Sequence, residues 1–360
     1  MSGPTIESLI AGWDGLGVVV RHDRPTGSWV FIALHDGTLG PLAGGTRLRT
    51  YPSPAAGLAD AQRLAAGMTA KWAAIDAPFG GGKAVLAAPG PLAGEERRGL
   101  LRRYGRLVDA LGGAFSTGPD LGTTMDDMRE IHRVTPYVHG FDPRTGAATD
   151  AGPFTARGVL AAIRAAVRQA AGSDDLAGRT VLVEGLGSVG APLARHLAAA
   201  GARLLVSDLE PDRAAALAAE LGARVVPLAE VPRTPCDVYA PCAVGGVLNR
   251  RTIPQLACRV VAGSANNQLE EERDARLLQE RGILYAPDYV ANAGGAIAFS
   301  LLGRGAAPEE IDSRLLGIGT TLAEVFREAE ARGETPLAAA ARKVEAVLAR
   351  ARGALGAAAP

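Results

Sequence analysis

Hydrophobic and polar positions follow two alternating patterns in the N-terminal half of the chain. Short runs rich in β-branched residues at 17–21 and 28–35 flank a polar turn, which predicts a β-hairpin. The stretch 53–74 instead repeats apolar residues at helical spacing. Ser53 is placed to cap this helix, and Pro54 suits its first position. This half is therefore predicted to be a mixed α and β domain.

A run of three glycines, residues 80–82, follows this helix. We expect the glycines to form a tight loop before a buried strand that starts at Lys83. Lys71 would lie in the last turn of the helix, so the loop would bring the two amines into one cleft. A lysine that is close to a second cation, or partly removed from water, has a lowered pKa and can act as a base near pH 7, whereas arginine cannot. Asp120 is a candidate partner carboxylate; the alternative is two solvated lysines beside a floppy loop.

From about residue 155 the pattern changes to alternating helices and apolar strands. The apolar run at 180–184 leads into Gly-Leu-Gly-Ser-Val-Gly at 185–190, which opens a predicted helix. The next strand ends at Asp208, 18 residues after Gly190. This strand–turn–helix context is the fingerprint of a dinucleotide-binding fold, whereas the glycines alone are a weak signal. The alternative is a structural glycine turn in an unrelated α/β domain.

Each part of this turn has an expected role in binding a dinucleotide. Gly185 makes the tight turn, Gly187 lets the backbone approach a pyrophosphate, and Gly190 lets the helix pack closely. Ser188 and Val189 complete the turn at the positive end of the helix. Asp208 is placed to bond a ribose 2′-hydroxyl and to repel a 2′-phosphate, so NAD is predicted in preference to NADP.

Composition narrows the class of protein. The 360 residues suffice for two domains, and 48% hydrophobic with 21% charged residues indicate a packed globular chain. The formal net charge is zero, so the chain lacks the excess of positive charge that is typical of proteins that bind nucleic acid or an anionic membrane. The N-terminus lacks the features of a signal peptide, so we expect a cytoplasmic protein. The three cysteines do not match a common zinc spacing, and no metal is expected.

Several motifs together resemble one enzyme family. They are GPLAGGTR (40–47), GMTAKWAA (67–74), PFGGGKAVL (78–86), TGPDLGTTMDDM (117–128), EGLGSVG (184–190), CDVYAPCAVGGVL (236–248), VVAGSANNQL (260–269) and APDYVANAGGAI (286–297). In this order they resemble the amino acid dehydrogenases that include the glutamate, leucine, valine and phenylalanine enzymes. Within that family the chain is most similar to the leucine and phenylalanine dehydrogenases.

The resemblance implies a two-domain α/β fold with a deep cleft. Residues 1–150 would form a mixed α/β domain that binds the substrate and makes subunit contacts. Residues 151–330 would form a Rossmann-type doubly wound domain that binds NAD, and residues 331–360 a helical tail. A homo-oligomer is expected, with dimer, tetramer and octamer all open.

The resemblance also implies roles in a reversible oxidative deamination. An L-amino acid, water and NAD would give a 2-oxo acid, ammonia and NADH. Lys71 would hold the substrate α-carboxylate, Lys83 would activate water and stabilise the carbinolamine, and Asp120 would exchange a proton with the substrate amine. The remaining implied positions line the substrate (Gly44, Gly45, Asn267) or the cofactor (Thr155, Cys242, Ala243, Asn266, Asn292).

The side-chain pocket implied by the resemblance is wide and apolar. Glutamate enzymes carry a lysine where this chain has Ala43, and a buried carboxylate without a partner costs several kcal/mol, on the order of 3–5. The other pocket positions are Gly118, Ala296 and Phe299. We therefore expect phenylalanine or another large apolar side chain. The alternatives that stay open are a leucine, valine or tryptophan dehydrogenase and a non-catalytic NAD-binding homologue. The sequence also leaves open the direction of the reaction in the cell and the role of Trp72.

Overall fold

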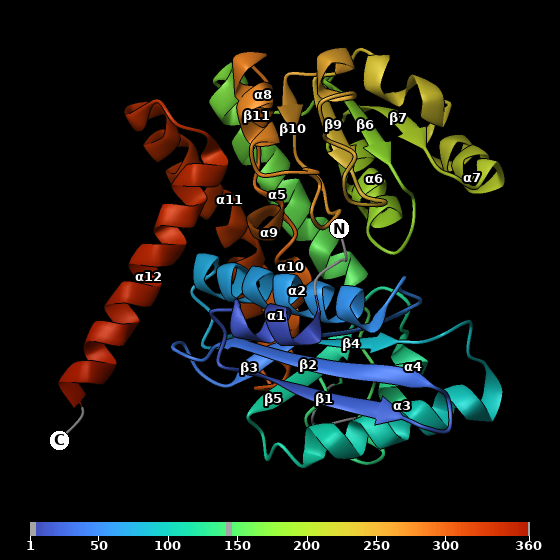
Figure 1. Ribbon diagram of the computed structural model, residues 1–360. Coiled ribbons are helices and arrows are strands. Elements are labelled where there is room, and N and C mark those ends of the chain that lie inside the picture. The colour runs from blue at the N-terminus through green and yellow to red at the C-terminus, as the bar shows by residue number, and fades with distance from the viewer. Residues whose placement is uncertain (1–4, 142–145, 359–360) are drawn as a thin grey trace. The chain divides into compact units, whose positions relative to one another are not determined.

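The computed structural model describes residues 5–141 and 146–358 (Figure 1). Their contacts divide them into two compact units. The first unit holds the residues up to Asp150, together with 299–305 and those from Ala346 onward. The second unit holds residues 151–298 and 306–345. Each unit has its own sheet, and each is described by itself below.

The first unit is built on a five-stranded mixed sheet in the order β1-β2-β4-β3-β5. The β1-β2 pair is the predicted antiparallel hairpin. Strand β4 runs antiparallel to β2 and parallel to β3, which is also parallel to β5. The strands are β1 (Gly17–Asp23), β2 (Ser28–Asp36), β3 (Leu42–Arg49), β4 (Gly80–Ala87) and β5 (Phe115–Pro119).

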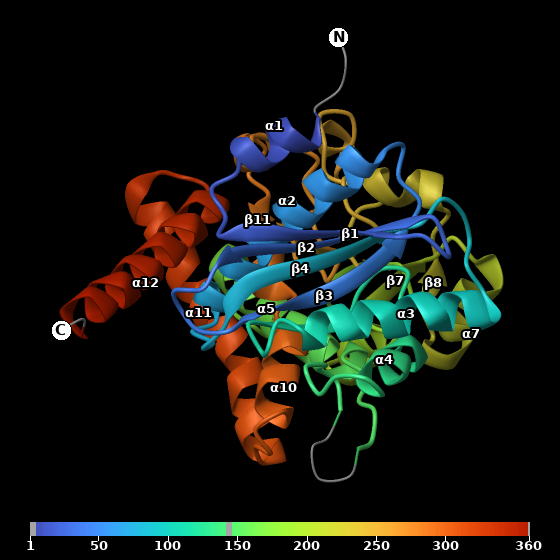
Figure 2. The same ribbon diagram turned by 60° about the horizontal axis from the view of Figure 1, so that its bottom comes forward.

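Helices cover both faces of this sheet. Helices α1 (Ile6–Ala11) and α2 (Pro54–Ala74) lie on one face, and α3 (Gly94–Asp109) and α4 (Met125–His132) on the other (Figures 1 and 2). The start of α2 is as predicted, because Ser53 accepts a hydrogen bond from the backbone of Ala56 and Pro54 is the first helical residue. Apolar residues of α2 such as Leu58 pack against β2 and β4, and those of α3 and α4 fill the opposite core.

The glycine triplet is not a loop, and this prediction was wrong. Helix α2 ends before the glycines, and Asp76, with a φ of 50°, turns the chain. Residues 80–82 are the first residues of β4 and are buried. A Cβ at Gly81 would lie 2.0 Å from Oγ1 of Thr69, so a side chain there would collide with α2. The glycines are bare because the strand lies tightly against its neighbours.

The second unit contains a six-stranded sheet in the order β11-β10-β9-β6-β7-β8, with parallel pairing throughout. The chain order changes direction between β6 and β9, which is the switch point of a doubly wound fold. The Rossmann-type fold predicted from the strand–turn–helix pattern is confirmed. The strands are β6 (Thr180–Glu184), β7 (Arg203–Ser207), β8 (Arg224–Val225), β9 (Val238–Pro241), β10 (Val260–Val261) and β11 (Leu284–Tyr285).

The remaining helices follow the predicted alternation and end in two long helices. Helices α11 and α12 are separated at Gly333, whose φ of 65° ends α11. Among the residues described here, no helix combines the length and apolar composition that a membrane crossing requires. The helices are α5 (Gly152–Ala171), α6 (Gly190–Ala199), α7 (Pro211–Leu221), α8 (Asp274–Glu280), α9 (Asp288–Ala291), α10 (Gly294–Leu302), α11 (Pro308–Arg332) and α12 (Pro336–Ala358), with 3₁₀ turns η1 (Leu228–Arg233) and η2 (Ile253–Gln255).

Candidate active site

A buried cluster of ion pairs lies in the first unit where β3, β4 and the end of β5 meet α2. The Lys83 amine is 3.2 Å from Oδ2 of Asp120. Arg47 donates from Nε to the same oxygen at 2.8 Å, and from Nη1 to Oδ2 of Asp60 in α2 at 3.0 Å. The side chains of Lys83, Arg47 and Asp120 are 6%, 9% and 13% exposed, so these charges interact with little screening by water.

Strand register places these groups. Arg47 of β3 pairs with Val85 of β4, so it lies two residues from Lys83 along the neighbouring strand, on the same face of the sheet. Asp120 follows β5 directly. Its backbone N–H donates to the hydroxyl of Thr123, which in turn donates to the Thr46 carbonyl of β3. The loop that carries Asp120 is thereby tied to the strand that carries Arg47.

The environment shifts the pKa values of both predicted catalytic groups. Burial lowers the pKa of the Lys83 amine; the charge of Asp120 opposes this shift, and that of Arg47 adds to it. Burial alone would raise the pKa of Asp120, but Lys83 and Arg47 outweigh it and lower that pKa. At neutral pH Asp120 is therefore ionised, and Lys83 loses its proton more readily than an exposed lysine does.

Three further predicted substrate residues lie in the first unit. Lys71 is partly buried in the last turn of α2, as expected. A Cβ at Gly45 would lie 3.3 Å from the Lys83 Nζ and 2.9 Å from the Asp120 Cβ, so glycine keeps the surroundings of both groups free. Gly44 lacks a side chain for a different reason, which is packing: a Cβ there would lie 1.8 Å from the Gly82 carbonyl oxygen of the neighbouring strand.

Three of the four predicted pocket residues belong to the first unit, and Ala296 belongs to the second. Ala43 is buried in β3, and Gly118 lies in the adjacent strand β5. A Cβ at Gly118 would be 3.6 Å from the His139 Cβ, and the Phe299 ring is 3.4 Å from where Gly140 would carry a Cβ. The segment 139–140 therefore connects Gly118 with Phe299.

An aromatic cluster supports Ala43 and β5. The Trp72 indole donates to the Ala43 carbonyl at 3.0 Å and packs on Phe79, with ring centroids 5.1 Å apart. Phe79 meets His139 edge to face, and Nε2 of His139 is 2.7 Å from Oγ of Ser116. Burial lowers the pKa of His139 to about 4, so its ring is neutral at pH 7. The side chains that contact Ala43 and Gly118 here are the Trp72 indole and the neutral His139, and Trp72 is a packing residue beneath β3.

The glycine turn of the second unit has the geometry expected of a phosphate-binding turn. Gly185 has a φ of 89°, and a Cβ at Gly190 would lie 1.8 Å from the Gly185 carbonyl oxygen. Around the Cβ position of Gly187 there is open space out to 4 Å. Ser188 and Val189 lead into α6, for which Val189 is the N-terminal cap. The turn follows β6 at the switch point of the sheet, where doubly wound folds bind their ligands.

Asp208 lies against this turn and also forms an ion pair with Arg213, which was not predicted from the sequence. Its Oδ2 accepts from the Leu186 backbone at 2.6 Å, and its Oδ1 accepts from the Glu210 backbone at 2.9 Å. Nη1 of Arg213 lies 3.1 Å from the same Oδ1. Burial works against the charge, but these two N–H groups and Arg213 lower the pKa of Asp208, which is ionised at neutral pH.

The other predicted cofactor residues also belong to the second unit. Ala243 lies against Gly185, and the Cys242 backbone donates to the Glu184 carbonyl at 2.7 Å. Nδ2 of Asn292 donates to Oδ1 of Asn266 at 2.8 Å, whereas the buried Oδ1 of Asn292 accepts no hydrogen bond among the described residues. Such an acceptor fits the carboxamide N–H₂ of a nicotinamide. Thr155 donates to the Ala151 carbonyl. Asn267, which was predicted to line the substrate, also belongs to this unit and has a φ of 52°.

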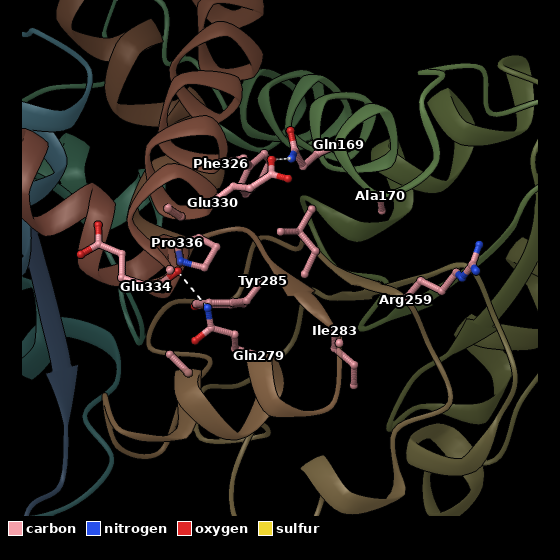
Figure 3. Close-up of a pocket in the computed structure, with 15 residues that line it drawn as sticks. Gln169, Ala170, Arg259, Gln279, Ile283, Tyr285, Phe326, Glu330, Glu334 and Pro336 are labelled. Atoms are coloured by element: carbon pink, nitrogen blue, oxygen red, sulfur yellow. Dashed lines mark hydrogen bonds between the residues drawn. The ribbon is translucent and has the colours of Figure 1, made fainter.

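The second unit also contains a cavity of about 530 Å³, lined by α5, α8, β11, α11 and the α11–α12 connection (Figure 3). Its apolar floor includes Tyr285 and Phe326. Its polar groups bond to one another, Gln169 to Glu330 and Gln279 to the Glu334 carbonyl (Figure 3). The residues that line this cavity include none of the predicted site residues, so it is separate from the proposed cofactor residues.

Comparison with known proteins points to one family. The profile described as Glu/Leu/Phe/Val dehydrogenase, dimerisation domain, matches residues 20–137, and the Glutamate/Leucine/Phenylalanine/Valine dehydrogenase profile matches residues 210–352. Leucine dehydrogenase of Bacillus cereus is 42% identical over 91% of this chain and 89% of its own length. Phenylalanine dehydrogenase of Lysinibacillus sphaericus is 40% identical over 91% and 87%. The crystal structure of L-tryptophan dehydrogenase from Nostoc punctiforme superimposes with a TM-score of 0.81 and 39% identity, over 96% of this chain and 99% of that one.

Proposed function

Because the chain belongs to the glutamate/leucine/phenylalanine/valine dehydrogenase family and is an amino acid dehydrogenase, we propose that it catalyses the NAD-dependent oxidative deamination of an apolar L-amino acid. The observation that carries the proposal is the buried Lys83–Asp120 pair beside the bare backbone of Gly45. An amine with a lowered pKa and an ionised carboxylate form an acid–base pair suited to moving protons on an amino acid.

Each group of this site has a proposed task. Lys71 binds the substrate α-carboxylate, and Gly45 leaves room for the substrate Cα. Asp120 accepts a proton from the substrate ammonium group, because only the free amine can become an imine. Lys83, in its neutral form, takes a proton from the water that adds to the iminium carbon, and then returns it to the nitrogen of the carbinolamine. As the C–N bond breaks and the C=O bond forms, the hydroxyl proton passes to the departing ammonia, which leaves as ammonium. A bound nicotinamide supplies the hydride acceptor, and the glycine turn with Asn292 would hold the dinucleotide.

We propose a large apolar side chain as the preferred substrate group. Small residues at Ala43 and Gly118, the neutral His139 and the ring of Phe299 beside Gly140 support an apolar pocket with space for a ring. A substrate carboxylate would find no compensating charge at Ala43, in an environment where an unpaired charge is strongly unfavourable. Identity to the leucine and phenylalanine enzymes is nearly equal and does not separate these substrates.

Reductive amination followed at 340 nm tests both the activity and the pocket. With ammonia and NADH, we expect kcat/KM for phenylpyruvate or indolepyruvate to exceed that for 4-methyl-2-oxovalerate and 3-methyl-2-oxobutanoate by about tenfold or more. 2-Oxoglutarate should be the poorest substrate of the panel. A preference for the branched acids would contradict the pocket proposal, and inactivity on the whole panel, with NADH still bound, would contradict the catalytic proposal.

Asp208→Ala should relax the preference for NAD. The substitution removes a carboxylate that would repel a 2′-phosphate and releases Arg213, which is then available to bind that phosphate. A charge-assisted hydrogen bond contributes about 1.5–3 kcal/mol, so the ratio of kcat/KM for NADP over NAD should rise by about 10- to 100-fold. Asp208→Ala combined with Arg213→Ala is the matched control, in which most of this gain should be lost. An unchanged ratio in the single variant would contradict the role of Asp208.

We also propose that the protein forms a homo-oligomer through its first unit. The family profile that matches residues 20–137 of this unit is described as a dimerisation domain.

A further inference from the structure

Arg47 lies between two buried carboxylates, and the reaction described above gives it no task. Its Nε and Nη1 contact Asp120 and Asp60 at 2.8 and 3.0 Å, and its side chain is 9% exposed. Asp60 is itself held firmly. Its Oδ2 also accepts from the Tyr51 hydroxyl at 2.6 Å, and its Oδ1 accepts from Nη2 of Arg63 at 2.6 Å.

We propose that Arg47, anchored by Asp60, is a positioning residue of the deamination reaction that fixes Asp120 and sets the charge balance around Lys83. The inference deepens the proposed function and rests on it. Arg47 contacts Asp120 directly. Among the hydrogen bonds and ion pairs of the described residues, Arg47 and Lys83 are linked only through this shared carboxylate.

The contacts of Asp120 indicate how it is positioned. Both Lys83 and Arg47 contact the same oxygen, Oδ2. In the part of the chain that the structure describes, the closest approach of both cations is to Oδ2, which leaves Oδ1 better placed to accept the proton of the substrate ammonium group. With Oδ2 held from two directions and the Asp120 backbone tied to Thr123, the carboxylate cannot rotate without breaking an ion pair.

An arginine at position 47 can contact both carboxylates at once. A planar guanidinium can donate from Nε to Asp120 and from Nη1 to Asp60 at the same time. A lysine amine is a single point of charge on a flexible stem and could not hold both carboxylates with the same directionality. Arg47 also stays protonated at every pH at which the enzyme works, so it gives Lys83 a cationic neighbour that does not titrate.

When Lys83 is protonated, the cluster formed by Lys83, Arg47, Asp120 and Asp60 is electrically balanced, with two cations and two carboxylates. Removing Arg47 takes away a charge that lowers the pKa of Lys83, and neutralising Asp60 takes away a charge that raises it. Two further groups contact Asp60 directly, Nη2 of Arg63 and the Tyr51 hydroxyl, each at 2.6 Å. Lys71 lies in the last turn of α2, the Arg49 guanidinium lies over the Tyr51 ring, and Nδ1 of His35 in β2 is 2.8 Å from Thr69 Oγ1.

Two single substitutions should therefore move the pH profile in opposite directions. Deamination needs neutral Lys83, so log kcat/KM rises with pH up to the pKa of that amine. Arg47→Gln should move this limb to higher pH, and Asp60→Asn should move it to lower pH, each by about one unit. The double variant restores balance and should return the limb close to its original position. A merely structural role would lower activity without producing opposite shifts.

A second readout does not depend on turnover. The lysines of the chain are Lys71, Lys83 and Lys343, so protein labelled with ¹³Cε-lysine gives three signals that single substitutions can assign. The titration of the Lys83 signal should shift in the same opposite directions in the two variants. If the signals shift but the 2-oxo acid panel shows no activity, the charge cluster is as we infer and the proposed function fails. If neither the signal nor the profile shifts, the inference about Arg47 is overturned.

Two further variants keep the test decisive. Arg47→Lys keeps the positive charge and serves if Arg47→Gln fails to fold. The rising limb of its pH profile should lie within about 0.3 pH units of the wild-type limb. Its kcat should be about tenfold lower, because the amine no longer fixes Asp120. Full kcat in folded Arg47→Lys would contradict the positioning role. Arg98→Gln, which removes an exposed partner of Glu95, is the surface control and should leave both kcat and the limb unchanged.

Discussion

Replacing Lys83 by alanine should lower kcat/KM for deamination by about 10³- to 10⁴-fold while changing NADH affinity by less than about twofold. The amine is 6% exposed, its pKa is lowered by burial, and it lies 3.2 Å from Asp120, so the variant loses the group that we propose transfers protons to and from water. The glycine turn and Asp208 belong to the second unit, whereas Lys83 belongs to the first. Cofactor affinity should therefore survive when turnover is lost.

Single-turnover and steady-state rates, with NADH binding followed by fluorescence, measure the two effects separately. Lys83→Arg is the informative companion variant, because it keeps a cation near Asp120 but cannot lose its proton near neutral pH. It should be almost as inactive as the alanine variant. Lys343→Ala, which removes a partly exposed partner of Glu324, is the matched control and should be fully active. Full activity of Lys83→Ala, or of Lys83→Arg, would contradict the proton-transfer role.

Elements with a strong local signal were predicted well from the sequence. The hairpin β1-β2 and helix α2 depend on residues close together in the chain, such as the polar turn before residue 28 and the cap at Ser53. The parallel sheet of the second unit followed from the alternation of apolar strands and helices after residue 155, because right-handed crossovers between parallel strands leave few alternatives. In these places local propensity and tertiary packing favour the same structure.

The glycine triplet shows where local rules fail. Three glycines predict a tight loop when only their neighbours in sequence are considered. In the fold, a Cβ at Gly81 would meet Thr69 of α2, and one at Gly82 would lie 2.7 Å from the ring of Phe115 in β5. These contacts come from other elements, so nothing in the segment itself reveals them. The same residues that forbid a side chain keep Lys83 in the interior of a strand and hold its amine in a fixed place.

Arg47 was present in a quoted motif, yet its role could not be predicted. Its partners Asp60 and Asp120 lie 13 and 73 residues away in sequence. Their meeting depends on the register of β3 against β4 and on the docking of α2, neither of which leaves a periodic signal. The sequence suggested Lys71 and Asp120 as the charges near Lys83. Asp120 does act on the pKa of Lys83, but the cation that acts on it is Arg47 and the second carboxylate is Asp60. A cationic residue two positions after a glycine pair in a strand was the available signal.

Asp120→Asn should impair both catalysis and stability, and the two effects should respond differently to pH. An amide cannot accept the substrate proton, so we expect kcat/KM to fall by about 10²- to 10⁴-fold. The variant also leaves Lys83 and Arg47 buried without the carboxylate that both contact, which should lower the free energy of unfolding at pH 7 by about 3–5 kcal/mol. The loss of that negative charge should also move the acid limb of the pH profile to lower pH.

The pH dependence of stability separates the lost charge from a loss of packing. The pKa of Asp120 is lowered in the folded protein, so its ion pairs stabilise the fold above the ordinary aspartate pKa of about 4 and lose this effect as pH falls through the folded value. Urea unfolding should therefore show a large difference between wild type and Asp120→Asn at pH 7, which narrows below about pH 4. Asp126→Asn in α4, where the carboxylate is exposed and paired with Arg129, should change stability by less than about 0.5 kcal/mol. A difference for Asp120→Asn that stays constant with pH would indicate lost packing alone, because only a titrating carboxylate held by Lys83 and Arg47 produces the narrowing.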